Sequence, residues 1–249
     1  YEVYLPHESV GACIDRDFNG TWGVDKGYFT GIEGIAYFPK TDIGSYKAGT
    51  LYLMGHSVPE LELALADEQV VKFSWEDTGE TPVFSEIAAD CTKVAADPSV
   101  AWIEPTSCYA WFADFENCET IEGLEYLNTS KVTNMASMFK GCVLLPSIDV
   151  SGFRTSNVIN MSEMFAGCTE LTELNLETFN TSNVEDMSGM FSEDSKLKTI
   201  KVTEAFSVAK VSNSKNMFKD CFSLVGGGQT AFDPAHTDIS AACIDNGGH

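Results

Sequence analysis

The sequence predicts an α/β solenoid of about five turns, each with one short helix and one strand, preceded by a β-rich N-terminal segment. A segment of eleven residues recurs with little change, and this is the main observation behind the prediction. The copies span residues 129–139, 155–165, 181–191 and, more weakly, 208–218. Their closing Met-Phe pairs begin at 138, 164, 190 and 217, steps of 26, 26 and 27 residues. Repeat periods of roughly 20–50 residues are typical of solenoids, in which successive turns stack.

The apolar residues of each copy are spaced as on one face of an α-helix. In the first copy they are Val132, Met135, Met138 and Phe139, at positions i, i+3, i+6 and i+7. Ser, Thr, Asn and Asp cluster at the start of the copy, where side-chain oxygens cap free backbone N–H groups. We therefore expect one short capped helix per turn. Met in these positions indicates core packing rather than a site for copper or another soft metal.

The second half of each turn carries a strand pattern. Leu171, Leu174 and Leu176 follow the L-x-x-L-x-L spacing of a leucine-rich repeat. One helix and one strand cannot bury their apolar faces alone, so stacked turns must share a core. Trp111-Phe112 lies 27 residues before the first Met-Phe pair and indicates an atypical first turn. The expected parts are a β-rich segment over 1–92, a leucine-rich-repeat-type solenoid over 93–224 and a C-terminal cap over 225–249.

Three segments of the N-terminal part predict strands. Residues 50–54 and 60–65 alternate apolar and other side chains, and residues 70–75 are rich in β-branched and aromatic residues. Clusters of Gly, Pro and Asp separate them. We expect these strands to pack on, or lead into, the first turn.

Composition narrows the function classes. The formal net charge is −22, from 37 acidic and 15 basic residues, and a field of that sign repels nucleic-acid phosphates. Solubility is the simplest consequence, and a surface that collects divalent cations is the alternative. No run of about 18 apolar residues is present, so no transmembrane segment is predicted. The four histidines lie far in sequence from any candidate nucleophile, and no phosphate-binding glycine loop occurs, so we predict no enzyme.

The repeat cysteines share one position. Cys142, Cys168 and Cys221 each follow the Met of their unit by four residues, and Phe115 and Asp194 stand at that position elsewhere. A position that accepts Cys or Phe is most simply a small buried apolar slot. A Cys142–Cys168 disulfide and metal ligation are the alternatives. No pair has CxxC spacing, so zinc is not supported.

The motif T-S-[NK]-V-x-[ND]-M-[SA]-x-M-F, followed by Gly-Cys and a leucine strand, resembles the BspA-like leucine-rich repeats of bacterial surface proteins, also catalogued as DUF285. The resemblance extends upstream to Asp97-Pro-Ser99 and downstream to Phe232-Asp-Pro-Ala-His-Thr-Asp238. It implies a secreted or bacterial cell-surface protein, often of host-associated bacteria, that serves adhesion or binding. No catalytic residue is carried over. Ser214, in place of Met, and Asp194, in place of Cys, depart from the pattern.

We therefore predict a non-enzymatic cell-surface or secreted module that binds a protein or glycan, including one from a host, through the solenoid face or the N-terminal segment. The alternative is a structural spacer that displays another domain. Outward strand residues of stacked turns line up in columns. The candidate binding residues form two such columns, Thr120, Ser147, Glu173 and Thr199, and Glu122, Asp149, Asn175 and Lys201. A solvated polar face without a ligand is the simpler interpretation of both columns.

A calcium loop is the one cofactor candidate. Asp15, Asp17 and Asn19 begin a D-x-D-x-N-G segment typical of such loops. Lys26 stands where an EF-hand needs a bidentate Glu. An ordinary turn rich in Asp, Asn and Gly is therefore the preferred interpretation, and no other cofactor is expected.

Overall fold

The computed structural model describes residues 15–16, 22–23, 34–75, 83–226 and 231–241. Over these residues the protein is mixed α/β, mostly strands, with one α-helix, α1 (Pro59–Leu65). The strands are β1 (Asp15–Arg16), β2 (Trp22–Gly23), β3 (Gly34–Pro39), β4 (Thr50–Met54), β5 (Val70–Trp75), β6 (Lys93–Ala96), β7 (Thr120–Glu122), β8 (Glu173–Asn175) and β9 (Thr199–Lys201). Single turns of 3-10 helix span Ser85–Ile87, Pro98–Trp102, Leu124–Tyr126 and Ile239–Ala241.

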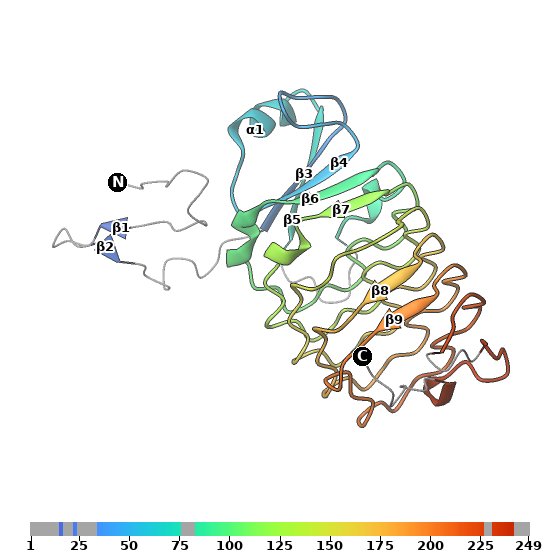
Figure 1. Cartoon of the computed structure of the whole chain (residues 1–249). Coiled ribbons are helices and arrows are strands. Elements are labelled where there is room, and N and C mark those ends of the chain that lie inside the picture. The colour runs from blue at the N-terminus through green and yellow to red at the C-terminus, as the bar shows by residue number, and fades with distance from the viewer. Residues whose placement is uncertain (1–14, 17–21, 24–33, 76–82, 227–230, 242–249) are drawn as a thin grey trace.

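One five-stranded sheet, in the order β5-β3-β4-β6-β7, joins the N-terminal strands to the start of the repeats (Figure 1). β3 pairs antiparallel with β4 and β5, whereas β4, β6 and β7 run parallel. β1 and β2 form a separate antiparallel pair, and β8 and β9 a parallel pair. The predicted strands over 50–54 and 70–75 are confirmed as β4 and β5, and β3 was not predicted.

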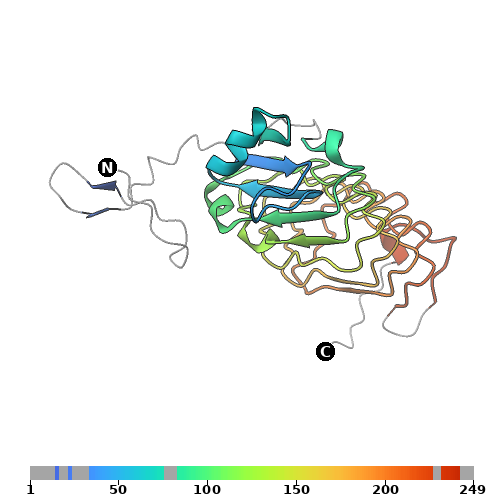
Figure 2. The same cartoon turned by 90° about the horizontal axis from the view of Figure 1, so that it is seen from above.

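The predicted strand over 60–65 is wrong, because this segment is α1. Pro59 occupies the first turn, where its missing N–H costs nothing, and Glu60 and Glu62 lie near the helix N-terminus, which favours negative charge. Glu, Leu and Ala are also strong helix formers. Leu61 faces inward from the helix and is buried in a small cluster with Tyr37 of β3. Figure 2 shows α1 beside the five-stranded sheet.

A single apolar cluster runs from the sheet into the last repeat. Alternate residues of β3 and β4 divide between two faces, since Ala36 and Leu51 belong to this large cluster and Tyr37 to the cluster under α1. The large cluster continues to Cys221 and includes the Met and Phe residues of the repeats. β6, on the far side of the predicted boundary at 92/93, belongs to the same sheet as β3 and β4. The division into three parts stays a prediction.

Successive repeat units lie side by side in parallel register. We number the units one to five by the pairs that begin at 111, 138, 164, 190 and 217. Isolated parallel bridges connect Ser107 to Asn134, Asn134 to Asn160, Asn160 to Asp186 and Asp186 to Asn213. Backbone N–H groups of unit two donate to carbonyls of unit three, as Phe139 N does to Met164 O at 2.9 Å. Hydrogen bonds between units therefore replace those within a helix.

The predicted helix in each unit is wrong, because two backbone positions per unit are left-handed. The first is occupied by Ala110, Ser137, Glu163, Gly189 and Asn216, and the second by Asp114, Gly141, Gly167, Glu193 and Asp220. Their φ angles lie between 50° and 75°, whereas an α-helix needs φ near about −63°. Each unit is thus a run of tight turns, such as the one closed by Lys140 N and Ser137 O at 3.1 Å.

The inward placement of the repeat residues is confirmed even though the helix is absent. All eight methionines are buried, and the Phe residues of adjacent units stack. The rings of Phe139 and Phe165 are 5.6 Å apart at 11°, and those of Phe165 and Phe191 are 6.1 Å apart at 5°. The predicted solenoid of five turns, each with a helix and a strand, is not confirmed, since the described part of unit two holds neither.

The polar start of the motif also has a structural role. Thr155 is buried, donates its hydroxyl to Asn180 O at 3.0 Å and accepts from Asn180 N at 2.8 Å. Asn160 Oδ1 accepts from Ser162 N at 2.9 Å, a turn closed by a side chain. Capping of backbone groups by these side chains is therefore right, but it closes turns and links units rather than starting a helix.

Candidate functional site

The strands β7, β8 and β9 position six of the eight predicted binding residues. Each strand buries its central residue in whole or in part and turns its flanking residues toward solvent, because side chains alternate along a strand. β7 carries Thr120 and Glu122, β8 carries Glu173 and Asn175, and β9 carries Thr199 and Lys201. Ser147 and Asp149 are exposed in unit two, which has no strand there. In Figure 1, β7, β8 and β9 follow one another along the same side of the molecule.

The parallel register brings matching residues of β8 and β9 together. Glu173 lies opposite Thr199, and Asn175 lies opposite Lys201. Strands paired in this way are about 4.8 Å apart, so side chains on neighbouring strands are within reach of one ligand. We call the exposed residues of β7, β8 and β9, with Ser147 and Asp149, the strand face.

Ion pairs already use three of the charges of the strand face. Lys201 Nζ lies 2.6 Å from Glu173 Oε1, and this hydrogen bond raises the pKa of Lys201. Glu122 Oε2 lies 2.7 Å from the ammonium of Lys93, on β6. Such exposed pairs contribute little to folding, because water screens them. Their main effect is to hold the four side chains in defined positions.

The remaining polar groups are also partly engaged. Asp149 accepts from the hydroxyl and backbone N–H of Ser151, and these two bonds lower its pKa. Asn175 Oδ1 accepts from Glu177 N at 3.0 Å. Sequence reasoning missed Lys93 and Glu177 as members of this surface. Lys93 stands 27 residues before Thr120, so the repeat spacing itself could have identified it.

The calcium candidate lies mostly outside the described residues. Asp15 belongs to β1, and only its backbone is described, while Asp17 and Asn19 fall in a part of the chain that the structure does not describe. Calcium binding at this segment stays a prediction. Over the described ranges, no group of three or more His, Cys, Asp or Glu side chains is placed to hold a metal ion.

The repeat cysteines lie in buried slots, as predicted, and act as hydrogen-bond donors. Cys168 Sγ donates to Phe139 O at 3.2 Å, and Cys221 Sγ donates to Phe191 O at 2.8 Å. The six cysteines of the described part are all buried free thiols, so the alternative of a Cys142–Cys168 disulfide is wrong. Burial raises the pKa of Cys221 to about 12. Cys221 is therefore a poor nucleophile, because the reactive form is the thiolate.

Asp194 takes the place of the cysteine in unit four. Its side chain is fully buried, Oδ1 accepts from Cys168 N at 2.8 Å, and Oδ2 has no partner among the described residues. Burial raises the pKa of this carboxyl group to about 9, against the smaller lowering effect of the backbone hydrogen bonds. The group is therefore protonated at neutral pH, and it lies inside the core rather than at a surface.

The described helices are all too short or too polar to cross a membrane. Residues 106–227 match the model of a family described as "Mycoplasma protein of unknown function, DUF285". No curated protein matches the chain.

Two solved structures are similar to parts of the chain. One is a leucine rich cell surface protein from Faecalibacterium prausnitzii A2-165, with 22% identity over 58% of this chain and 40% of that chain, at a TM-score of 0.37. The other is a leucine rich repeat protein from T. pallidum, with 14% identity over 55% of this chain and 66% of that chain, at a TM-score of 0.32. The chain spans less than two thirds of either protein. The family match confirms the resemblance noted in the motifs, since residues 106–227 match the DUF285 model.

Proposed function

We propose that this chain is a non-enzymatic binding module of a secreted or cell-surface bacterial protein, and that it recognises a protein or glycan through the strand face. The observation that supports this most is the parallel register of β8 and β9, which presents Glu173, Asn175 and Lys201 as a compact exposed group. The side chains stand on a continuous buried core, so their positions are defined before a partner arrives. Preorganised groups lose less entropy on binding.

We also infer that the stacked units form a leucine-rich-repeat solenoid of about five turns. The parallel bridges from Ser107 to Asn213 and the match of residues 106–227 to the DUF285 model support this inference. The same match, with the resemblance to bacterial surface proteins, supports a location outside the cell. The N-terminal segment is a second candidate region for partner contacts.

Replacement of three strand-face residues tests the binding proposal. The variant combines Asp149→Ala, Glu173→Ala and Asn175→Ala, and binding is measured against immobilised host matrix and mucosal proteins and an array of host glycans. The strand face carries no aromatic or Arg anchor, so we expect weak binding of each copy. Loss of two carboxylates and an amide should weaken the interaction by about tenfold or more.

The matched control removes polar groups elsewhere on the repeats. Thr133→Ala, Glu185→Ala and Ser212→Ala truncate exposed residues that precede the bridge positions. We expect this control to bind like the unchanged protein. Full binding by the variant of Asp149, Glu173 and Asn175 would contradict the proposal that the strand face binds a partner.

A structural spacer is the second candidate function. The ion pairs Glu122–Lys93 and Glu173–Lys201 favour it, since charges that neutralise each other are not available to a partner. A spacer predicts that no immobilised protein or glycan retains the chain. It also predicts that an unrelated rigid segment of equal length restores display of the neighbouring domain when it replaces residues 106–227.

A further inference from the structure

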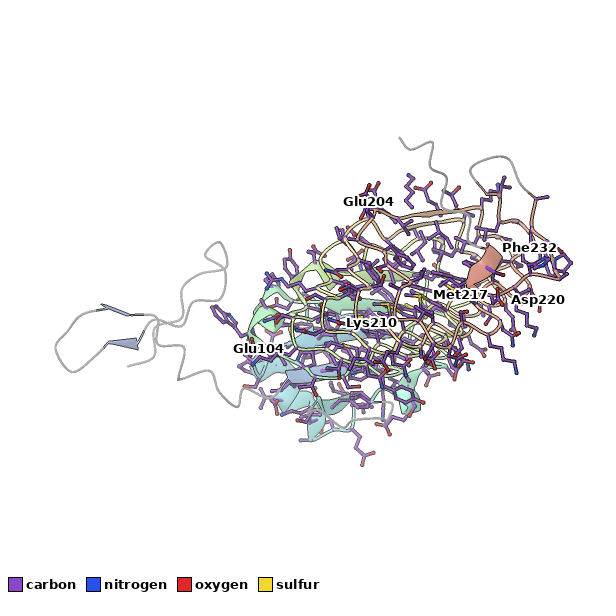
Figure 3. All side chains as sticks on the ribbon, turned by 90° about the horizontal axis from the view of Figure 1, so that it is seen from below. Glu104, Glu204, Lys210, Met217, Asp220 and Phe232 are labelled. Carbon is purple, nitrogen blue, oxygen red and sulfur yellow. The ribbon has the colours of Figure 1, made fainter. Side chains whose placement is uncertain are left out.

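A polar hollow of about 390 Å³ lies over units four and five, apart from the strand face. Its lining includes Glu163, Gly189, Ser192, Glu193, Lys215 and Asn216. The volume is near the lower end of the range for small-molecule sites, roughly 300–1,000 Å³. In Figure 3, Asp220 of the same unit lies near Phe232 and far from Glu104, so the hollow belongs to the C-terminal end of the described repeats.

The hollow exists because one unit lacks a side chain that its neighbours carry. Gly189 occupies the first left-handed position of unit four, with φ of 60°. Units three and five place Glu163 and Asn216 at that position, with φ of 53° and 60°. Units in this register lie about one strand spacing apart, so a residue missing from one of them leaves a gap between the side chains on either side. Gly189 lines the hollow beside this gap, and a Cβ added to it would lie 3.2 Å from Glu163 Cγ.

The groups around the gap include several without a partner. Within the described residues, the side-chain amide of Asn216 and the hydroxyl of Ser192 make no hydrogen bond, and Lys215 makes no ion pair. The carboxylate of Glu163 is turned to Lys140, at 2.7 Å. Glu193 lies 3.6 Å from Lys219, which also faces Asp220 at 3.5 Å. Lys215 is thus the cation left over for a ligand, with an amide and a hydroxyl beside it.

We propose that this hollow binds an acidic monosaccharide unit, with the sugar carboxylate on Lys215 and sugar hydroxyls on Asn216, Ser192 and Glu193. An ammonium–carboxylate hydrogen bond is stronger than a neutral one, so Lys215 sets the preference for an acid. Amide and hydroxyl groups both donate to and accept from sugar hydroxyls, and a carboxylate accepts from them. The site is independent of the strand face, and either one can bind without the other.

A peptide carboxylate is the less favoured occupant. Tight peptide and protein contacts depend on aromatic or aliphatic anchors that fill apolar pockets. The side chains that line the hollow are Ser, Asn, Lys and Glu, with Gly189 as the only residue without a polar side chain. A ligand covered with hydroxyl groups matches this lining better than a peptide does.

Titration of the complete chain with small probes, followed by NMR of its backbone and side-chain amides, tests the proposal. The probes are glucuronic acid, glucose as its uncharged counterpart, and the acidic tripeptide Gly-Glu-Gly. We expect glucuronic acid to shift the signals of Gly189, Lys215 and Asn216 in the millimolar range, with little change from the other two probes. Added salt should weaken the effect, because Lys215 is exposed.

Two variants assign the effect to the hollow. Gly189→Asn fills the gap with a residue that tolerates positive φ, and its Cβ meets Glu163 Cγ, a flexible side-chain atom, at 3.2 Å. It should abolish the shifts, whereas Gly44→Asn, the same substitution at an exposed left-handed position between β3 and β4, should leave them intact. Lys215→Gln should weaken binding by about tenfold or more while keeping the hollow. Melting temperatures identify any variant that fails to fold.

Several outcomes would overturn the proposal. These are equal shifts from glucose and glucuronic acid, shifts from the tripeptide alone, no shifts from glucuronic acid, or full binding by folded Gly189→Asn. None of these outcomes affects the proposal for the strand face, which is tested separately with the variant of Asp149, Glu173 and Asn175.

Discussion

Asp194 is a buried acid in a position where the neighbouring units use a cysteine. Cys168 and Cys221 each donate a thiol to a Phe carbonyl of the preceding unit, whereas Asp194 leaves Oδ2 without a partner among the described residues. A buried polar atom with no hydrogen bond costs roughly 1–3 kcal/mol. The acid therefore lowers the stability of the repeats.

Replacement of Asp194 by the residue of the neighbouring units should stabilise the fold. Asp194→Cys restores the buried thiol, and Cys168 N keeps its bond to Phe165 O at 3.2 Å. We expect a gain of at least about 1 kcal/mol at pH 8, measured by urea unfolding under reducing conditions. A control, Glu204→Cys, changes an exposed acid of the repeats and should alter stability by less than about 0.5 kcal/mol.

The gain should depend on pH with a defined sign. The pKa of Asp194 is raised from 3.8 to about 9 in the folded protein, so the folded state holds a proton that the unfolded state has lost between these values. The stability that this proton provides is complete below pH 4 and is lost as the pH rises toward 9. The advantage of Asp194→Cys should therefore grow from pH 5 to pH 8. An advantage that stays constant or shrinks over this range would contradict a protonated Asp194.

At the scale of elements, the alternating sequence of residues 60–65 has two interpretations, a strand and the helix α1. A strand over residues 60–65 would place Leu61, Leu63 and Leu65 on the same face. In α1, Leu61 is fully buried while Leu63 is 78% exposed. Leu61→Ala should cost about 2–5 kcal/mol, and Leu63→Ala should change stability by less than about 0.5 kcal/mol. Equal losses for the two variants, measured by thermal or urea unfolding, would favour the strand.

The repeats show how far the sequence predicts such elements. The spacing of Val132, Met135, Met138 and Phe139 correctly predicts which side chains are buried. It wrongly predicts a helix, because a run of turns with left-handed residues at Ser137 and Gly141 buries the same positions. Hydrogen-bond partners decide between the two, and those partners lie in the next unit. Local spacing carries no information about them.

The strand face and the hollow differ in how far the sequence predicts them. Outward positions such as Glu173 and Asn175 follow from alternation along one strand, so the sequence is sufficient to predict their exposure. Their pairing with other units, as in Glu173–Lys201, depends on register and was not predicted. The hollow arises from Gly189 compared with Glu163 and Asn216, which becomes visible only once the left-handed positions are aligned.

At the scale of the whole molecule, one apolar cluster joins the described five-stranded sheet to the repeats, from Ala36 to Cys221 of unit five. Unfolding of one part exposes the apolar surface of its neighbour, so the sheet and the repeats should unfold together. Cys91 and Cys221 report on the two ends, since both are buried free thiols. We expect both to become reactive to a thiol reagent over the same urea range, as measured by mass spectrometry of labelled peptides.

Separate transitions would show instead that the parts are independent. Phe165→Ala removes a ring from the centre of the stack and provides a check, because it should lower the urea midpoint at both cysteines together. A shift at Cys221 alone would contradict a single cooperative unit.

The parallel register from Ser107 to Asn213 has a further consequence for how such a chain changes over generations. Each repeat unit offers the next one the same hydrogen-bond donors and acceptors. Loss or duplication of one 26-residue block would therefore still leave matching units side by side. The number of repeat units can therefore change over generations while the apolar core stays intact. Surface features such as the gap at Gly189 would move, vanish or multiply with each block, and new recognition surfaces would arise by recombination rather than by redesign of the core.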